Sequence, residues 1–216
     1  MKKQRIPRIK NSMRYLRQSG LKVKYVLDIG VAEGTPWLQQ SFPGAMHRLI
    51  EPNSDYNSQI HSNYEDYSHE LTNVALGAEP NPEATVTLVK PGDTSHAQTY
   101  KIDTPITTLD SLYIIPDQHS VLKIDVDGYE LDVLAGGQDT LPRFDILIIE
   151  AKLHKMAETI STVPDCFTLW DIVNLDYDWG ELAQVDLIFK NRFLDIDTQR
   201  KDYPEYQAFR QGVEMI

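Results

Sequence analysis

The sequence contains little cysteine, no long apolar run, and few basic residues beyond its first segment. Its single cysteine, Cys166, has no partner for an internal disulfide, which fits a reducing compartment. No apolar run approaches the roughly 20 residues that a membrane-spanning helix needs. The basic start, residues 1–18, has no apolar core of a secretory signal. We therefore expect a cytoplasmic protein without a transmembrane segment.

Charge is distributed unevenly along the 216 residues. Nine of the 21 Lys and Arg residues lie in residues 1–24, which contain no acid, so the rest of the chain has 12 basic and 32 acidic residues. Such an acidic body should repel a nucleic-acid backbone, whose binding depends on many phosphate contacts. We therefore expect no nucleic-acid partner. The basic segment could bind an acidic partner or a membrane surface, or pack as a helix on its own domain.

Apolar strands alternate with helical segments, and this pattern predicts an α/β fold with a doubly wound, mostly parallel sheet. The expected strands are 23–29, 48–50, 71–76, 121–126, 145–150, 167–173 and 184–189, and the expected helices include 36–41, 54–67 and 156–162. Residues 83–107 break the pattern and indicate an inserted antiparallel strand and loop region. We expect a basic N-terminal arm or helix at 1–24, one domain at 25–194, and a C-terminal tail at 195–216 packed on that domain.

A glycine turn follows the first expected strand, in the sequence VLDIGVAEGT at 26–35. Asp28 ends the apolar run, and Gly30 and Gly34 follow it. Glycine lets the backbone approach a ligand closely because it has no Cβ. The turn lacks the third glycine of the dinucleotide fingerprint and the Lys-Ser/Thr pair of a P-loop. On its own it could also be an ordinary strand-to-helix turn capped by Asp28.

A second motif, HRLIEPN at 47–53, ends another apolar strand on an acid. Glu51 lies about 20 residues beyond the glycine turn. This spacing matches the acid that binds ribose hydroxyls in a βαβ nucleotide site. The two motifs together predict a cofactor that contains a nucleoside and has little or no pyrophosphate.

A third motif, LKIDVDGYELDVLAGG at 122–137, carries several acids. Asp125 lies at the tip of the expected strand, and ligands bind beyond the carboxyl ends of parallel strands. Alternatively, Asp125 caps the next helix and pairs with Lys123. Asp125, Asp127 and Glu130 could bind Mg²⁺ or Ca²⁺ through oxygen. However, only the first two share a face of a strand, so we expect no metal.

These motifs resemble those of the FkbM-type S-adenosylmethionine-dependent methyltransferases. The resemblance runs from about residue 25 to residue 193, with further matching blocks at TTLDSL (107–112), DILIIEAKLH (145–154) and 169–189. It implies a seven-stranded, Rossmann-like class I methyltransferase fold with an antiparallel last strand, and S-adenosyl-L-methionine as the cofactor. Asp127 departs from the family, which more often has glutamate there.

The resemblance also implies roles for single residues around the cofactor. We expect Asp28 to bind the amino group of the methionine moiety, directly or through water, and Gly30 and Gly34 to approach the cofactor. Glu51, followed by Asn53 in the EPN motif, is expected at the ribose, and Ala75 at the border of the adenine.

The candidate catalytic residues are Asp125, Glu150 and His154. The resemblance places Asp125 between cofactor and substrate. Glu150 ends another buried strand and His154 follows it, so either could be a base or a substrate anchor. Such a histidine could equally be a solvated or capping residue.

We therefore expect a methyltransferase, and the reaction that we favour is O-methylation of a hydroxyl on a sugar, glycan or secondary metabolite. One alternative is N-methylation of a peptide or amine by the same fold. Another is a nucleoside-binding protein without catalysis, because fold does not determine function.

Overall fold

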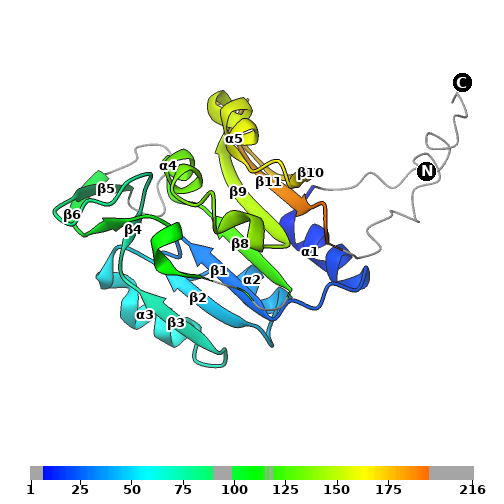
Figure 1. The fold of residues 1–216 in the computed structure, drawn as a ribbon, viewed down its shortest axis with the longest axis horizontal. Coiled ribbons are helices and arrows are strands. Elements are labelled where there is room, and N and C mark those ends of the chain that lie inside the picture. The colour runs from blue at the N-terminus through cyan, green and yellow to red at the C-terminus, as the bar shows by residue number, and fades with distance from the viewer. Residues whose placement is uncertain (1–6, 90–98, 115, 117–118, 195–216) are drawn as a thin grey trace, which may run out of the picture.

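The computed structural model describes residues 7–89, 99–114, 116 and 119–194. Its centre is a seven-stranded sheet with the strand order β10-β11-β9-β8-β1-β2-β3 (Figure 1). The parallel strands are β1 (Tyr25–Ile29), β2 (Met46–Ile50), β3 (His69–Thr72), β8 (Ser120–Ile124) and β9 (Ile146–Lys152). β10 (Phe167–Asp178) pairs with β11 (Glu181–Asn191), which is antiparallel to both of its neighbours. The mostly parallel sheet and the antiparallel last strand are thus confirmed.

Helices cover both faces of the sheet. On one face, α1 (Ile9–Gln18) and α2 (Pro36–Ser41) pack on the alternate apolar residues of β1, β8 and β9. On the other face, α4 (Glu130–Ala135) and α5 (Met156–Thr162) pack on the remaining residues of these strands. Because the central strands are buried on both sides, their sequences are nearly continuous apolar runs.

The N-terminal helix has an apolar stripe that packs on the sheet. Ile9, Met13 and Leu16 are buried in the core below α1, and the Ser12 hydroxyl donates a 2.6 Å hydrogen bond to Asp171 of β10. The helix is therefore part of the packed structure, with its basic residues on the outer side.

Two expected elements are shorter than predicted. The strand expected at 71–76 ends at Thr72, and β4 (Ala75–Leu76) pairs instead with β7 (Ile106–Thr107) in a separate small sheet. The side-chain amide of Asn73 donates to the Glu51 carbonyl at 2.9 Å, which fixes the bend between β3 and β4. The helix expected at 54–67 consists of the 3-10 turn η1 (Ser54–Tyr56) and α3 (Asn57–Asn63).

The inserted region contains an antiparallel hairpin, as predicted. It consists of β5 (Thr85–Val89) and β6 (Thr99–Asp103). The expected loop between them lies mostly outside the described residues, as does the expected tail at 195–216. The short 3-10 turns η2 (Asp110–Leu112), η3 (Leu141–Arg143) and η4 (Leu153–Lys155) complete the fold.

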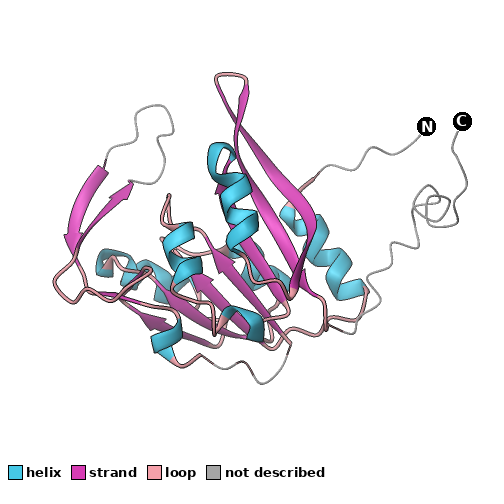
Figure 2. Cartoon of the chain, turned by 45° about the horizontal axis from the view of Figure 1, so that its top comes forward, coloured by secondary structure: helices cyan, strands magenta, loops and turns pink. Residues whose placement is uncertain are grey.

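The β10–β11 hairpin is longer than the sequence indicates. Its strands have 12 and 11 residues, and the hairpin projects beyond the rest of the sheet (Figure 2). The turn residues Trp179 and Gly180 have φ values of 50° and 86°, and such a pair of positive φ angles is typical of a tight hairpin turn. At the projecting end of β10, Leu175 and Tyr177 alternate with acids and are exposed, so this end lacks the continuous apolar run on which the prediction depended. Among the described residues, no helix is long and apolar enough to span a membrane.

Candidate active site

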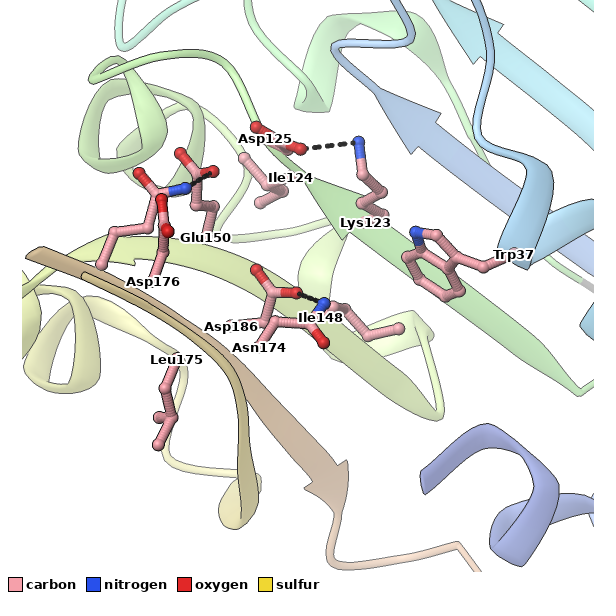
Figure 3. A pocket seen from close by; sticks show the side chains of 11 residues that line it. Trp37, Lys123, Ile124, Asp125, Ile148, Glu150, Asn174, Leu175, Asp176 and Asp186 are labelled. Carbon is pink, nitrogen blue, oxygen red and sulfur yellow. Dashed lines mark hydrogen bonds and ion pairs between the residues drawn. The ribbon is translucent and has the colours of Figure 1, made fainter. Parts of the chain in front are cut away.

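Two cavities adjoin at the carboxyl edge of the parallel strands. The large cavity, of about 770 Å³, is lined by the glycine turn, Glu51, β4, β5–β6 and the β10–β11 hairpin. The small cavity, of about 400 Å³, lies beside β8 and β9, between Trp37 and the β10–β11 hairpin (Figure 3). Five lining residues are common to both cavities: Trp37, Lys123, Asp125, Asp176 and Gln184. This edge is where an open α/β sheet binds its ligands.

The glycine turn packs directly against the end of β8. Gly30 has φ +80°, and a Cβ at this position would lie 1.7 Å from the carbonyl oxygen of Asp125. Any other residue would therefore push the two loops apart. Gly34 has φ +132°, a backbone conformation that L side chains rarely adopt. Both glycines line the large cavity, and Gly30 also brings Asp125 against the turn.

Glu51 is 4% exposed and connects β2 to the glycine turn. One of its carboxylate oxygens accepts a hydrogen bond from the Ala32 N–H at 2.8 Å, and the other from the Asn53 N–H at 2.9 Å. Burial raises the pKa of Glu51, while these N–H groups act in the opposite direction. A carboxylate offers about four lone-pair sites, so Glu51 can still accept bonds from a ligand in the large cavity.

The end of the large cavity near β4 contains two tyrosines that the sequence did not single out. Tyr56 and Tyr100 line it together with Ala75. Asn53 lies behind this wall: it is buried, and its side-chain amide donates to the Tyr100 hydroxyl at 2.8 Å. The contact links η1 to the β5–β6 hairpin, so Asn53 shapes this end of the cavity from outside its lining.

A buried lysine connects the first and third motifs. Asp28 and Lys123 are register partners across β1 and β8, and Lys123 Nζ lies 3.1 Å from Asp28 Oδ1. The same ammonium lies 3.3 Å from Asp125 Oδ2 and donates to the Gly30 carbonyl at 3.0 Å. Burial alone would lower the pKa of Lys123, but Asp125 and Asp28 raise it above its ordinary value. Asp28 is fully buried and lies outside the lining of both cavities.

Carboxylates dominate the small cavity. Glu150, whose side chain is 11% exposed, accepts a hydrogen bond from the Gln184 amide and lies 3.3 Å from Lys152 Nζ. Burial, followed by the nearby Asp125, raises the pKa of Glu150 to about 7. Asp186 accepts a 2.7 Å hydrogen bond from Asn174, and the same two causes raise its pKa to about 6.

A family model described as the methyltransferase FkbM domain matches residues 28–179. The chain belongs to the FkbM methyltransferase family. The protein is thus an S-adenosylmethionine-dependent methyltransferase, and S-adenosylmethionine is its cofactor. A comparison with curated proteins found no match.

Solved structures share the fold at low sequence identity. An rRNA methylase from Streptococcus thermophilus has a TM-score of 0.52 and 13% identity, over 88% of this chain and 98% of that chain. A ribosomal protein L11 methylase from Lactobacillus delbrueckii subsp. bulgaricus has a TM-score of 0.50 and 10% identity, over 84% and 76%. TrmN from Thermus thermophilus has a TM-score of 0.47 and 11% identity, and the match covers 85% of this chain but only 48% of TrmN. The first two likenesses show the fold alone.

The residues around the large cavity of this FkbM methyltransferase fit its cofactor. Glu51 has acceptor capacity for a ribose diol, and the wall at Tyr56, Ala75 and Tyr100 offers flat and apolar surface for a base. Asp28 Oδ2 is buried and has no hydrogen-bond partner among the described residues. Because Asp28 lies outside the lining of the large cavity, it could reach the amino group of a methionine moiety only through a bridging water, and its expected role stays a prediction.

The structure does not bring His154 to either cavity. This residue lies in η4 and is exposed, whereas the neighbouring Glu150 faces the small cavity. Glu130, an acid of the third motif, accepts bonds from the N–H groups of Val126 and Gly128 at 3.2 and 2.9 Å and so holds the loop after β8. Within the described ranges, no group of three His, Cys, Asp or Glu side chains could hold a metal ion.

Sequence reasoning missed the contribution of the β10–β11 hairpin. Asp176, Gln184 and Asp186 line the small cavity from this element. The sequence carries one signal for Asp186, because this acid interrupts the otherwise apolar run of β11. Asp176 lies between Leu175 and Tyr177, and Gln184 begins the strand predicted at 184–189, but neither position carried a signal of a cavity residue.

Proposed function

We propose that the protein is an O-methyltransferase that transfers the methyl group of S-adenosylmethionine, bound in the large cavity, to a hydroxyl in the small cavity. The observation that carries the proposal is the position of Asp125, which lines both cavities at the end of β8. A hydroxyl that approaches from the small cavity would meet this carboxylate at the boundary with the donor.

In this proposal the residues around the large cavity hold the cofactor, which supplies an already activated methyl group. Glu51 binds the ribose hydroxyls, and the turn from Gly30 to Gly34 covers the cofactor with its backbone. Asp28, which lies behind the lining, acts on the amino group through a bridging water, while Ala75 and the wall that Asn53 supports border the base.

Asp125 orients the acceptor hydroxyl and takes its proton as the new bond forms. Positioning alone can contribute strongly when the reacting atoms are held about 3–3.5 Å apart. Lys123 supports this role, because its ammonium holds one Asp125 oxygen and the Gly30 carbonyl in fixed places. The other Asp125 oxygen is then available to the acceptor, since 40% of this side chain is exposed.

N-methylation of an amine is the second candidate function, and the acidic small cavity favours it. Its carboxylates would attract an ammonium, and Glu150, with a pKa of about 7, could remove a proton before transfer. The position of the methyl group in the product separates the two candidates.

The direct test is to incubate the protein with methyl-labelled S-adenosylmethionine and a panel of hydroxyl and amine acceptors. We expect a labelled product, and fragmentation mass spectrometry and NMR should place the methyl group on oxygen. A product methylated on nitrogen would support the second candidate instead. Cofactor binding without transfer to any acceptor would favour a nucleoside-binding protein.

The ribose role of Glu51 gives a separate prediction. Glu51→Gln replaces one acceptor oxygen by an amide donor, so one N–H or ribose hydroxyl loses its partner. Loss of such a charged hydrogen bond should weaken binding of S-adenosylhomocysteine by about 1.5–3 kcal/mol, or roughly 10–150-fold, as measured by calorimetry. Glu33→Gln is the matched control, because Glu33 is an exposed acid of the same turn. A folded Glu51→Gln variant with unchanged affinity would limit Glu51 to holding the turn.

A further inference from the structure

The small cavity has a strong excess of negative charge. Asp125, Glu150, Asp176 and Asp186 line it, and Lys123 is the only cation in the lining. Lys123 is already paired with Asp28 behind the cavity and with Asp125 at its edge. The cavity thus offers several carboxylates to a ligand and no cation without a partner.

Glu150 and Asp186 are placed together by the register of the sheet. They are partners across the antiparallel strands β9 and β11, so their side chains project from the same face. Each carboxylate is held by an amide of the β10–β11 hairpin, Gln184 for Glu150 and Asn174 for Asp186. The amides fix the orientation of the carboxylates but do not neutralise them. Lys152 lies near Glu150, and the cation that acts on Asp186 is Lys123, which is already paired with Asp28 and Asp125. Figure 3 shows the carboxylates of Asp125, Glu150 and Asp186 around one space, with Trp37 across it.

The position of Glu150 and Asp186 in the fold makes ionisation of their carboxylates energetically unfavourable. Burial is the largest cause that raises the pKa of both groups, and Asp125 raises it further; the hydrogen bond from Asn174 opposes part of this rise in Asp186. Buried charge is costly unless it is paired, so a cation in this space would stabilise the ionised forms. An acidic cavity of this kind discriminates between ligands by charge.

We propose that the methyl acceptor carries an ammonium group, which Glu150 and Asp186 bind in the small cavity while the acceptor hydroxyl faces Asp125. The acceptor is then a hydroxylated amine, such as an amino sugar or an amino alcohol. This inference rests on the proposed function, because the cavity is taken as the acceptor site from its shared boundary with the donor cavity. Trp37 can contribute a cation–π contact from the opposite side.

The test uses the full chain with S-adenosylhomocysteine bound, and matched pairs of ligands that differ in one charge. The probes are glucosamine, 2-aminocyclohexanol and 3-amino-1-propanol, each compared with its N-acetyl derivative. Ligand-observed NMR and calorimetry should show that at least one amine binds tenfold or more tightly than its acetylated partner. Asp186→Asn should reduce that ratio to less than threefold and leave S-adenosylhomocysteine binding unchanged. Glu158→Gln, an exposed acid of α5, is the control and should keep the ratio.

The affinity of the amine should also depend on pH. Ionised carboxylates bind the ammonium, so the affinity for 2-aminocyclohexanol and 3-amino-1-propanol, whose amines stay protonated over this range, should rise from pH 5 to pH 8, through the pKa values of about 6 and 7. The charged groups that act on Glu150 are Asp125, Lys152 and Glu130, and those that act on Asp186 are Asp125 and Lys123. In calorimetry, binding near pH 6.5 should release protons to the buffer.

A stability measurement without an acceptor tests whether ionisation of Asp186 is unfavourable in the folded protein. In the native state the raised pKa of Asp186 destabilises the carboxylate, so native stability is lost as the pH rises through about 6. Asp186→Asn should therefore raise the melting temperature at pH 8 more than at pH 5. The proposal is overturned if no amine in the panel binds more tightly than its acetylated partner, or if Asp186→Asn leaves the preference intact. Failure of S-adenosylhomocysteine to bind would instead count against the proposed function.

Discussion

Asp125→Asn should lower turnover by about 10²–10⁴-fold while the affinity for S-adenosylhomocysteine changes by no more than a few fold. Asparagine keeps the shape of the side chain and an oxygen for Lys123, but it cannot take a proton from the acceptor. Single-turnover kinetics with labelled S-adenosylmethionine should report the lost rate, and calorimetry the retained affinity. Asp132→Asn, an exposed acid on α4, is the matched control and should have no effect.

Two results would change this assignment. If Asp125→Asn mainly destroys cofactor binding, the residue belongs to the donor site, and Glu150 becomes the better base because it faces the same small cavity. EDTA should leave turnover intact in the wild-type protein, because Glu130 is committed to backbone N–H groups and only Asp125 and Asp127 remain of the three candidate metal ligands. Loss of turnover with EDTA and its recovery with Mg²⁺ would show that a metal participates.

The parts of the site that could be predicted from the sequence lie at the ends of parallel strands. Gly30, Glu51 and Asp125 each follow an apolar run, and this edge of the sheet brings them around one cavity. Strand order and hairpin register are not visible in a single sequence. For this reason the pairing of Asp28 with Lys123 and the juxtaposition of Glu150 with Asp186 emerged only from the structure.

Alternation in a strand explains a further difference between expectation and structure. Glu150 was grouped with His154 because both follow the apolar run of β9. However, the strand continues to Lys152, so the side chain of Glu150 projects toward the small cavity, and the chain then turns in η4, which contains His154. Strand β9 thus ends two residues later than predicted, which places Glu150 in the cavity lining and leaves His154 exposed.

Lys123→Met should lower the free energy of unfolding by about 3–5 kcal/mol, because it leaves the Asp28 carboxylate buried without its cation. Asp28 is fully buried and Lys123 is 6% exposed, so solvent cannot replace the lost partner without a rearrangement of the core. Methionine is close to lysine in length and fills the same space, so little of the loss should come from packing. Equilibrium unfolding in urea at pH 7.5 measures the effect.

The double variant Asp28→Asn/Lys123→Met is the control that separates charge from packing. Replacing both members of a buried ion pair by neutral residues is often neutral for stability, so the double variant should regain most of the loss. Turnover should not recover with stability, because Asp125 and the Gly30 carbonyl have both lost the ammonium that fixes them. Stability of Lys123→Met within 1 kcal/mol of the wild type would show that Lys123 does not compensate Asp28. Full turnover in the double variant would show that Asp125 is held in place without Lys123.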